Sequence, residues 1–373
     1  RAADRMAGGV RRVADALRAD GVDGDLCDAL PLQASTLHRL LGLLPGRTAA
    51  RFDAVEPLKL DVLVVDEASM VDLPLMCKLL EALPTGARLL LLGDRDQLPS
   101  VEAGDVLTAL VAASDAPVHA RAPLAGRRVH LDRTYRQTDT LTLEPVADAV
   151  RRGDAADALA ALRAGTDGLR FHEGALDPLA PDTRDALLAP WRELRACSEP
   201  HDALARVNRA RLLTALREGP QGAVQLNTRI ELALAGAQRE PYFHGRLLMV
   251  TENSARHGLF NGDVGVCLRD VDGAPIAWFD GPDGPRAFHP GALPAHASAF
   301  ATTVHKAQGS EFDVVWLQLP SVDTRVLTRE LVYTGLTRAR SALHVLGPAS
   351  AIEAALARHA RRVSGLAQRL GAA

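Results

Sequence analysis

Residues 61–100 read DVLVVDEASMVDLPLMCKLLEALPTGARLLLLGDRDQLPS, and this stretch decides the fold. An apolar run at 61–65 ends in the acidic pair Asp66 and Glu67, and a second apolar run at 88–92 ends in GDRDQLPS. The segment between the runs predicts a helix, because its apolar residues recur at helical spacing behind an Asp that can cap the first turn. Two buried strands joined by a helical crossover form a βαβ unit of a parallel sheet. The chemistry of such sheets lies at the carboxyl ends of the strands, where these polar residues stand.

The length and composition are those of a folded protein with more than one domain. The chain has 373 residues, of which 47% are hydrophobic and 24% charged, enough to bury a full core. The net charge of −3 gives no global signal for nucleic acid, although a local groove can still bind it. The four cysteines have no metal or redox spacing, and no apolar run reaches the length of a membrane span. The sequence therefore predicts a cytoplasmic protein.

The rest of the first half of the chain alternates helical and strand patterns. Before and after the opening stretch, helices are predicted at 1–18, 37–44 and 104–113, with an Ala/Pro-rich linker at 114–126. Beyond the linker, strands are expected at 127–131, at 169–172 and near Arg195, within a largely helical or buried segment. Further helices are predicted at 143–152, 155–162 and 226–234.

From about Pro241 the sequence pattern changes to short β-like runs. Short β-like runs, separated by Gly, Asp and Pro turns, are found at 246–251, 264–269, 275–279 and 286–289. This pattern is typical of a small barrel or curled sheet. Buried strands then return at 299–304, 314–319 and 342–346, with a helix at 328–336.

The acidic pair after the first strand is suited to phosphoryl transfer. One carboxylate can hold Mg²⁺ while the other orients a water. The alternative is a loop with solvated acids, but the preceding LVV and the following Ala68-Ser69 favour the functional interpretation. Gln97, at the end of the next strand, is placed to sense the γ-phosphate of a nucleotide. Taken alone, Gln97 would be interpreted as a polar turn residue.

Two arginine-bearing segments could complete a phosphate site. In DRTYRQ, at 132–137, Arg136 offers a fork that binds phosphate bidentately, and Tyr135 can stack on a base. In VYTGLTRAR, at 332–340, Arg338 lies past a predicted helix and can reach a transferring phosphate. Each alone has an ordinary alternative, a surface ion pair or a solvated basic helix end.

A third segment, ATTVHKAQGSEFDVV at 301–315, suits a nucleic-acid backbone. Thr303, His305 and Lys306 stand on a turn between two buried strands, and Gly309 allows close backbone approach. The alternative is an ordinary capped turn between a strand and a helix.

Five segments in this order resemble motifs II to VI of superfamily 1 helicases, and above all those of the RecD family, the alpha chains of exodeoxyribonuclease V. They are LVVDEASMVD, LLGDRDQLPSV, LDRTYRQ, TVHKAQGSEFD and VYTGLTRAR. The resemblance implies an α/β fold with two RecA-like parallel-sheet domains of the P-loop NTPase type. The first would span 1–126 and the second 127–240 with 297–373. An SH3-like β-barrel insert would span 241–296.

The resemblance also implies a role for each motif residue, with ATP and Mg²⁺ as cofactors. At the reacting phosphate, Asp66 would bind Mg²⁺, Glu67 would activate water, Gln97 and Arg136 would contact the γ-phosphate, and Arg338 would be the arginine finger. Around the nucleotide it implies Tyr135 at the adenine, Glu311 near the ribose, and Gly309. The residues expected to contact DNA are Thr36, His38, Asn261, Thr303, His305 and Lys306.

One departure from the family pattern is large. The string GxxxxGK[ST], whose Lys holds the β- and γ-phosphates, does not occur, and none of Lys59, Lys78 and Lys306 follows a glycine-rich loop. The opening RAADRM resembles the tail of motif Ia, so we expect the chain to be cut between motifs I and Ia. The intact protein would be an ATP-driven 5′→3′ DNA helicase acting at double-strand-break ends with the beta and gamma chains, RecB and RecC. The chain alone would hydrolyse ATP poorly.

Three alternatives differ in class. The chain could be a catalytically silent subunit that binds DNA and partners, as the missing P-loop favours, or a standalone RecD-like helicase. A nuclease is disfavoured, because one common type needs a Lys two residues after Asp or Glu, and none of the three lysines has that context.

Overall fold

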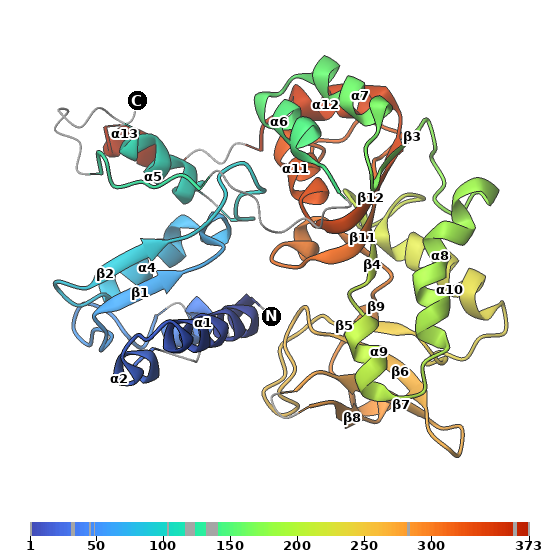
Figure 1. Ribbon diagram of the computed structural model, residues 1–373, viewed down its shortest axis with the longest axis horizontal. Helices are drawn as coiled ribbons and strands as arrows, with labels where there is room; N and C mark the ends of the chain where they lie inside the picture. The colour runs from blue at the N-terminus through green and yellow to red at the C-terminus, as the bar shows by residue number, and fades with distance from the viewer. Residues whose placement is uncertain are drawn as a thin grey trace. The chain divides into compact units, whose positions relative to one another are not determined.

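The computed structural model describes residues 2–30, 34–44, 46–47, 49–102, 104–115, 124–131, 141–281, 284–360 and 364–371, without the side chains of residues 2–6. The chain divides into two compact units, Arg1–Asp132 with Arg361–Ala373, and Arg133–Ala360 (Figure 1). No helix of the described ranges is long and apolar enough to cross a membrane.

The first unit is built on the predicted βαβ stretch. Its elements are α1 (Ala2–Ala19), α2 (Gly24–Asp28), α3 (Leu37–Leu40), β1 (Val62–Val65), η1 (Ala68–Met70), α4 (Leu73–Ala82), β2 (Arg88–Leu91), α5 (Val106–Ser114) and α13 (Leu366–Arg369). Strands β1 and β2 pair in parallel, as expected, and Asp72 caps α4 by accepting from Leu75 N at 2.8 Å. The face of the sheet that carries Val65 packs on Met76 and Leu79 of α4.

The opposite face of this two-stranded sheet is open. Val64 pairs with Leu90 in the register, and these side chains are 42% and 46% exposed. Val62 and Leu92, on either side of them, are also exposed. Both strands are apolar runs in the sequence, yet the described residues of the first unit cover only one face of the sheet.

The second unit contains a five-stranded parallel sheet in the order β10-β4-β11-β12-β3. Its strands are β3 (Leu169–Glu173), β4 (Ala210–Thr214), β10 (Ala301–Thr303), β11 (Phe312–Gln318) and β12 (Ala339–Gly347). Its helices are α6 (Glu144–Arg152), α7 (Ala155–Ala164), α8 (Pro181–Arg195), α9 (Pro200–Arg206), α10 (Ala223–Ala235), η3 (His305–Ala307), α11 (Arg329–Leu336) and α12 (Ala349–Leu356). The α/β class with parallel sheets is thus confirmed.

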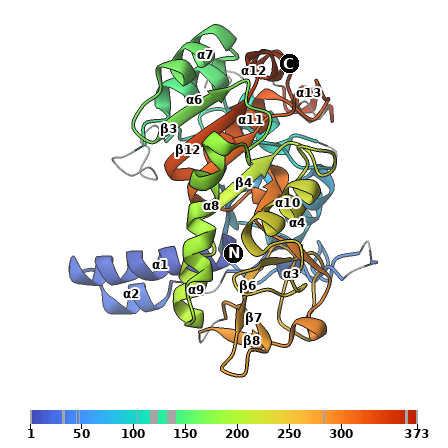
Figure 2. The ribbon, with the colours of Figure 1, turned by 90° about the vertical axis from the view of Figure 1, so that its right-hand side faces the viewer.

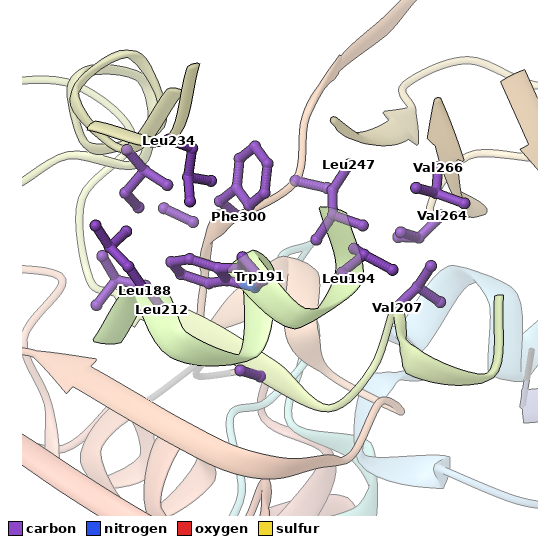
Figure 3. Packing of buried hydrophobic residues seen from close by; sticks show 14 of the residues in the cluster. Leu188, Trp191, Leu194, Val207, Leu212, Leu234, Leu247, Val264, Val266 and Phe300 are labelled. Carbon is purple, nitrogen blue, oxygen red and sulfur yellow. The ribbon is translucent and has the colours of Figure 1, made fainter. Parts of the chain in front are cut away.

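The main core of this unit lies where α8 and α10 pack on the parallel sheet. Trp191 of α8 meets Phe300 edge-on, with ring centroids 5.2 Å apart, and Leu212 of β4 and Leu234 of α10 close the cluster (Figure 3). Leu247 and Val266 extend the same cluster into the strands that follow α10. The core is therefore continuous between the parallel sheet and those strands.

Those strands form a five-stranded antiparallel sheet in the order β8-β7-β6-β5-β9. They are β5 (Leu247–Val250), β6 (Val264–Arg269), β7 (Pro275–Phe279), β8 (Arg286–Phe288) and β9 (His296–Ser298), with η2 (Pro290–Ala292) before the last. Helix α9 packs on β6 and β7 (Figure 2). The β-rich segment is confirmed as a sheet, and its SH3-like character stays a prediction. Inside it Cys267 is fully buried, and burial raises the pKa of its thiol to about 12.

Two of the strand predictions are wrong. Residues 127–131 form no strand. The segment near Arg195 is the end of α8, which continues through Pro190 because burial of Leu187, Trp191 and Leu194 outweighs the helix-breaking cost of proline, about 3 kcal/mol. The strand of this region is β4, whose five residues are all buried. A strand buried on both faces shows no alternation, so its sequence resembles a buried helix.

Candidate functional site

The Asp66–Glu67 loop follows β1 at the carboxyl end of the first sheet. Asp66 is exposed, and its Oδ1 accepts from Glu67 N at 2.9 Å. Among the described residues other than glycine, Glu67 is the one with a positive φ, 54° with ψ 40°. A left-handed backbone costs an L-residue roughly 1–2 kcal/mol, and such strain concentrates at functional sites.

The loop that follows β2 holds this strained turn in place. Ala68 N donates to Leu92 O at 2.8 Å, and Leu92 N donates to Val65 O at 2.8 Å. A Cβ on Gly93 would stand 2.8 Å from Leu107 Cδ2 and 3.1 Å from Ala68 N, so the two loops meet where only glycine fits. Strain at Glu67 is therefore supported by close packing from the neighbouring strand end.

Gln97 belongs to the same loop and is buried. Its Nε2 donates to Asp94 Oδ2 at 3.3 Å, while Asp94 Oδ1 accepts from Asp96 N at 2.9 Å. Because the carboxyl ends of parallel strands share one edge, Asp66, Glu67 and Gln97 lie at the same edge of the first sheet. Nearby, the Ser69 hydroxyl is buried and has no hydrogen-bond partner among the residues that the structure describes.

Arg338 lies in the second unit and is only 1% exposed. It follows α11, where its Nε donates to Thr334 O at 3.2 Å and a terminal nitrogen donates to Ser310 O at 3.3 Å. Carbonyl oxygens therefore hold the guanidinium, and it links the end of α11 to the turn after β10.

That turn carries three of the residues predicted to contact nucleic acid, Thr303, His305 and Lys306. Thr303 Oγ1 accepts from Lys306 N at 3.4 Å, Lys306 is exposed, and His305 is half-buried. Gly309 has φ 67°, which a side chain would strain. Glu311 is half-buried just beyond it.

Three further predicted residues lie on other elements. Thr36 caps α3 by accepting from Arg39 N at 3.3 Å, and His38 is exposed on that helix. Asn261 is exposed on a turn of the antiparallel sheet, where its N donates to Asn253 Oδ1 at 2.9 Å. Tyr135 and Arg136 lie outside the described residues.

Comparison with known proteins shows what the chain is similar to. Residues 2–174 match the AAA domain family, and residues 298–346 match the UvrD-like helicase C-terminal domain. The RecBCD enzyme subunit RecD of Mycobacterium tuberculosis H37Rv is 41% identical over 96% of this chain and 62% of the relative. That of Haemophilus influenzae Rd is 33% identical over 94% of this chain and 60% of the relative.

The chain is similar to RecD subunits over nearly its whole length.

It spans about three fifths of the length of these RecD relatives. The ATP-dependent RecD2 DNA helicase of Deinococcus radiodurans is 34% identical over 87% of this chain and 41% of that protein. Among solved structures, Bacteroides Pif1 bound to ssDNA aligns with 84% of this chain and 78% of its own, at 16% identity and a TM-score of 0.44. That TM-score is too low to add to the family assignment.

Sequence reasoning missed two polar groups inside the second unit. One is the carboxylate of Glu231 on α10, which is 7% exposed; the signal in the sequence is an acidic residue on a mainly apolar helix face that also carries Asn227. The other is a histidine pair on the parallel sheet. His172 Nε2 and His344 Nδ1 lie 3.0 Å apart, and the ring of His344 stacks on Trp316 at 3.8 Å between centroids. The signal in the sequence is a single His within each of two strand-like runs, LRFHE at 169–173 and ALHVLG at 342–347.

Proposed function

We propose that this chain is the motor part of an ATP-dependent DNA helicase, the alpha subunit of an exodeoxyribonuclease V-type complex. It would translocate 5′→3′ on single-stranded DNA at double-strand-break ends, together with beta and gamma chains. The single observation that carries the proposal is the strained Asp66–Glu67 turn, packed against the Gln97 loop at the carboxyl edge of a parallel sheet. Similarity to RecD subunits and to the ATP-dependent RecD2 DNA helicase of Deinococcus radiodurans supports it.

The domain organisation that we propose follows the family. Residues 1–126 would form the first RecA-like domain, and 127–240 with 297–373 the second. Residues 241–296 would form an SH3-like insert, whose antiparallel strands support this assignment.

The residues at the sheet edge fit Mg²⁺ with a nucleotide. Among the described residues no cluster of three or more His, Cys, Asp or Glu side chains could hold a metal unaided. Mg²⁺ commonly binds one or two carboxylates together with substrate phosphates, so the exposed Asp66 suffices on the protein side. Bound MgATP would supply the phosphoryl group and neutralise its charge. Glu67 would accept the proton of the attacking water, and Gln97 would orient the γ-phosphate.

The second unit would contribute the rest of the nucleotide site. Arg136 would contact the γ-phosphate, Tyr135 the adenine, and Gly309 with Glu311 the sugar side. Arg338 would stabilise the charge that develops during transfer, for which its guanidinium must leave the carbonyls of Thr334 and Ser310.

Single-stranded DNA would contact both units. The proposed contacts are Thr36, His38, Asn261, Thr303, His305 and Lys306. Of these side chains, those of Thr36, His38, Asn261 and Lys306 are exposed, as a backbone contact requires, and those of Thr303 and His305 are half-buried.

A substitution at the acidic pair tests the motor. In the full-length gene product, Glu67→Gln should remove nearly all DNA-stimulated ATP hydrolysis while DNA binding persists, since only the water-activating carboxylate is changed. Glu173→Gln makes the same chemical change at an exposed carboxylate that pairs with Arg163, so it is the matched control and should keep full activity. Retention of ATPase by the Glu67 variant would refute the assignment. Co-purification with beta and gamma chains distinguishes a complex subunit from a standalone helicase.

The second candidate is a DNA-binding subunit without catalysis, favoured by the lack of GxxxxGK[ST] in these 373 residues. We propose that the 373-residue chain alone binds single-stranded DNA but hydrolyses ATP little or not at all. Appreciable DNA-stimulated ATPase from the purified chain would overturn that proposal.

A further inference from the structure

Two segments connect the antiparallel sheet of the second unit to its parallel sheet. The chain enters the antiparallel sheet along residues 236–246, between α10 and β5, and leaves it along 296–301, through β9 into β10. We call these two segments the neck. Any movement of the antiparallel sheet relative to the parallel sheet would have to bend the neck, so the side chains that hold the neck limit that movement together with the shared core.

One buried carboxylate binds both segments of the neck. Glu231 Oε2 accepts from Arg239 Nε at 3.2 Å and from its terminal nitrogen at 3.0 Å. Its Oε1 accepts from Arg246 Nε at 3.0 Å and from Ser298 Oγ at 2.7 Å. The arginines belong to the entering segment and the serine to the leaving one. A carboxylate buried to this extent is stable only with its partners in place, so the four contacts act together.

The same helix also holds the strand that leads to the proposed DNA-binding turn. Asn227 stands one helical turn before Glu231 and on the same face. Its Nδ2 donates to Ala301 O at 2.8 Å, and its Oδ1 accepts from Ala301 N at 2.8 Å. Ala301 opens β10, which runs directly into Thr303. Helix α10 therefore joins the neck to β10 through two polar side chains.

A second helix, α8, also holds the entering segment of the neck. Arg195 Nε donates to His244 O at 3.2 Å, and a Cβ on Gly245 would stand 2.2 Å from Arg195 Cγ. His244 in turn bonds Cys197 O at 2.9 Å and accepts from Arg269 N at 3.1 Å. The neck is thus packed and hydrogen-bonded rather than a flexible linker.

We propose that Glu231 is a positioning residue, which fixes the direction in which the antiparallel sheet presents its Phe260–Asn261 turn to single-stranded DNA. The inference rests on the proposed function, in which this turn contacts DNA. Phe260 is 49% exposed, and an exposed aromatic ring offers a face on which a base can stack. When the binding-competent orientation is populated only part of the time, apparent affinity falls by that fraction.

A double-mutant cycle tests the inference on the full chain. Affinity for a fluorescein-labelled oligothymidylate is measured by anisotropy for the unmodified chain, Phe260→Ala, Glu231→Gln and the double variant. Phe260→Ala should weaken binding roughly fivefold or more, the range of base stacking on an aromatic ring. Glu231→Gln should weaken it about threefold to tenfold. In the Glu231→Gln background, Phe260→Ala should then cost at least about threefold less than in the unmodified chain.

The outcomes separate the two proposals. An equal cost of Phe260→Ala in both backgrounds overturns the role of Glu231 and leaves DNA contact by the turn intact. No cost of Phe260→Ala in the unmodified chain refutes that contact, and the role of Glu231 with it. As the matched control, Glu173→Gln removes a carboxylate from an exposed pair with Arg163 and should leave the Phe260→Ala cost unchanged. If circular dichroism shows Glu231→Gln to be unfolded, Ser298→Ala, which removes one hydrogen bond to the same carboxylate, replaces it in the cycle.

Discussion

The histidine pair of the parallel sheet should make the second unit lose stability between pH 7 and pH 5. Burial lowers the pKa of His344 from 6.5 to about 4, and the neighbouring His172 and Arg170 add to the effect. Burial also lowers the pKa of His172, which Asp182 at the start of α8 opposes and Arg170 reinforces. The folded unit therefore keeps His344 neutral at a pH where the unfolded chain protonates it.

The sign and size follow from these pKa values. The unfolded state binds the extra proton, so the stabilisation is complete above about pH 6.5 and declines as the pH falls toward about 4. At pH 5 the full shift would cost about 2 kcal/mol of the free energy of unfolding. The His344 ring is half-buried, and solvent screening reduces this to about 1 kcal/mol.

Urea unfolding followed by tryptophan fluorescence measures the effect, since Trp316 stacks on His344. The unmodified chain should lose about 1 kcal/mol more between pH 7 and pH 5 than His344→Gln does. His201→Gln, at a histidine whose side chain is 86% exposed, is the control and should behave like the unmodified chain. Glu173 and Asp323 have lowered pKa values in the unmodified chain and in His344→Gln alike, so their contribution to the pH dependence cancels when the two are compared. An identical pH dependence for His344→Gln and the unmodified chain would refute the reasoning.

Three further predictions concern packing and accessibility. Gly93→Ala should lower the free energy of unfolding of the first unit by about 1–3 kcal/mol, measured by denaturant titration, because its Cβ would meet Leu107 and Ala68; an equally stable variant would show that the loops can separate. In the native chain Ellman's reagent should modify the exposed Cys77 quickly and spare Cys267, whose thiol is buried with its pKa raised to about 12; modification of both at one rate would contradict the burial. Replacing Val64 and Leu90 together by threonine should reduce both the binding of a hydrophobic dye and self-association measured by light scattering. Val65→Thr is the buried control and should instead unfold the unit. Unchanged dye binding would show that the open face is not the surface that binds the dye.

The sequence predicted the parts of the fold whose signals are local. The βαβ stretch at 61–100 carries its own cap and apolar pattern, and the strands of the antiparallel sheet are marked by Gly and Pro turns. It failed at β4, because a strand covered on both faces has no alternating pattern, and at α8, because tertiary burial overrides Pro190.

The candidate site shows the same division between features with local signals in the sequence and features that depend on tertiary contacts. Asp66, Glu67 and Gln97 could be assigned to one sheet edge, since parallel topology brings the carboxyl ends of strands together. The left-handed backbone of Glu67 and the carbonyl contacts of Arg338 could not be predicted from the sequence, because both depend on residues that folding brings close together. Glu231 was missed for a related reason, as its partners Arg246 and Ser298 stand 15 and 67 residues along the chain.

The contact between Asn227 and β10 also bears on how the chain avoids association with other copies of itself. β10 is the outermost strand of the parallel sheet, and an outermost strand invites pairing with another molecule. Asn227 occupies both the N–H and the carbonyl of Ala301, so its side-chain amide stands where the backbone of an incoming strand would bind. Of the three residues of β10, Ala301 and Thr303 face outward, so that one amide takes up half of the outward backbone groups of this strand. Asn227→Leu should therefore leave the core packed but turn this edge into a template for intermolecular strand addition.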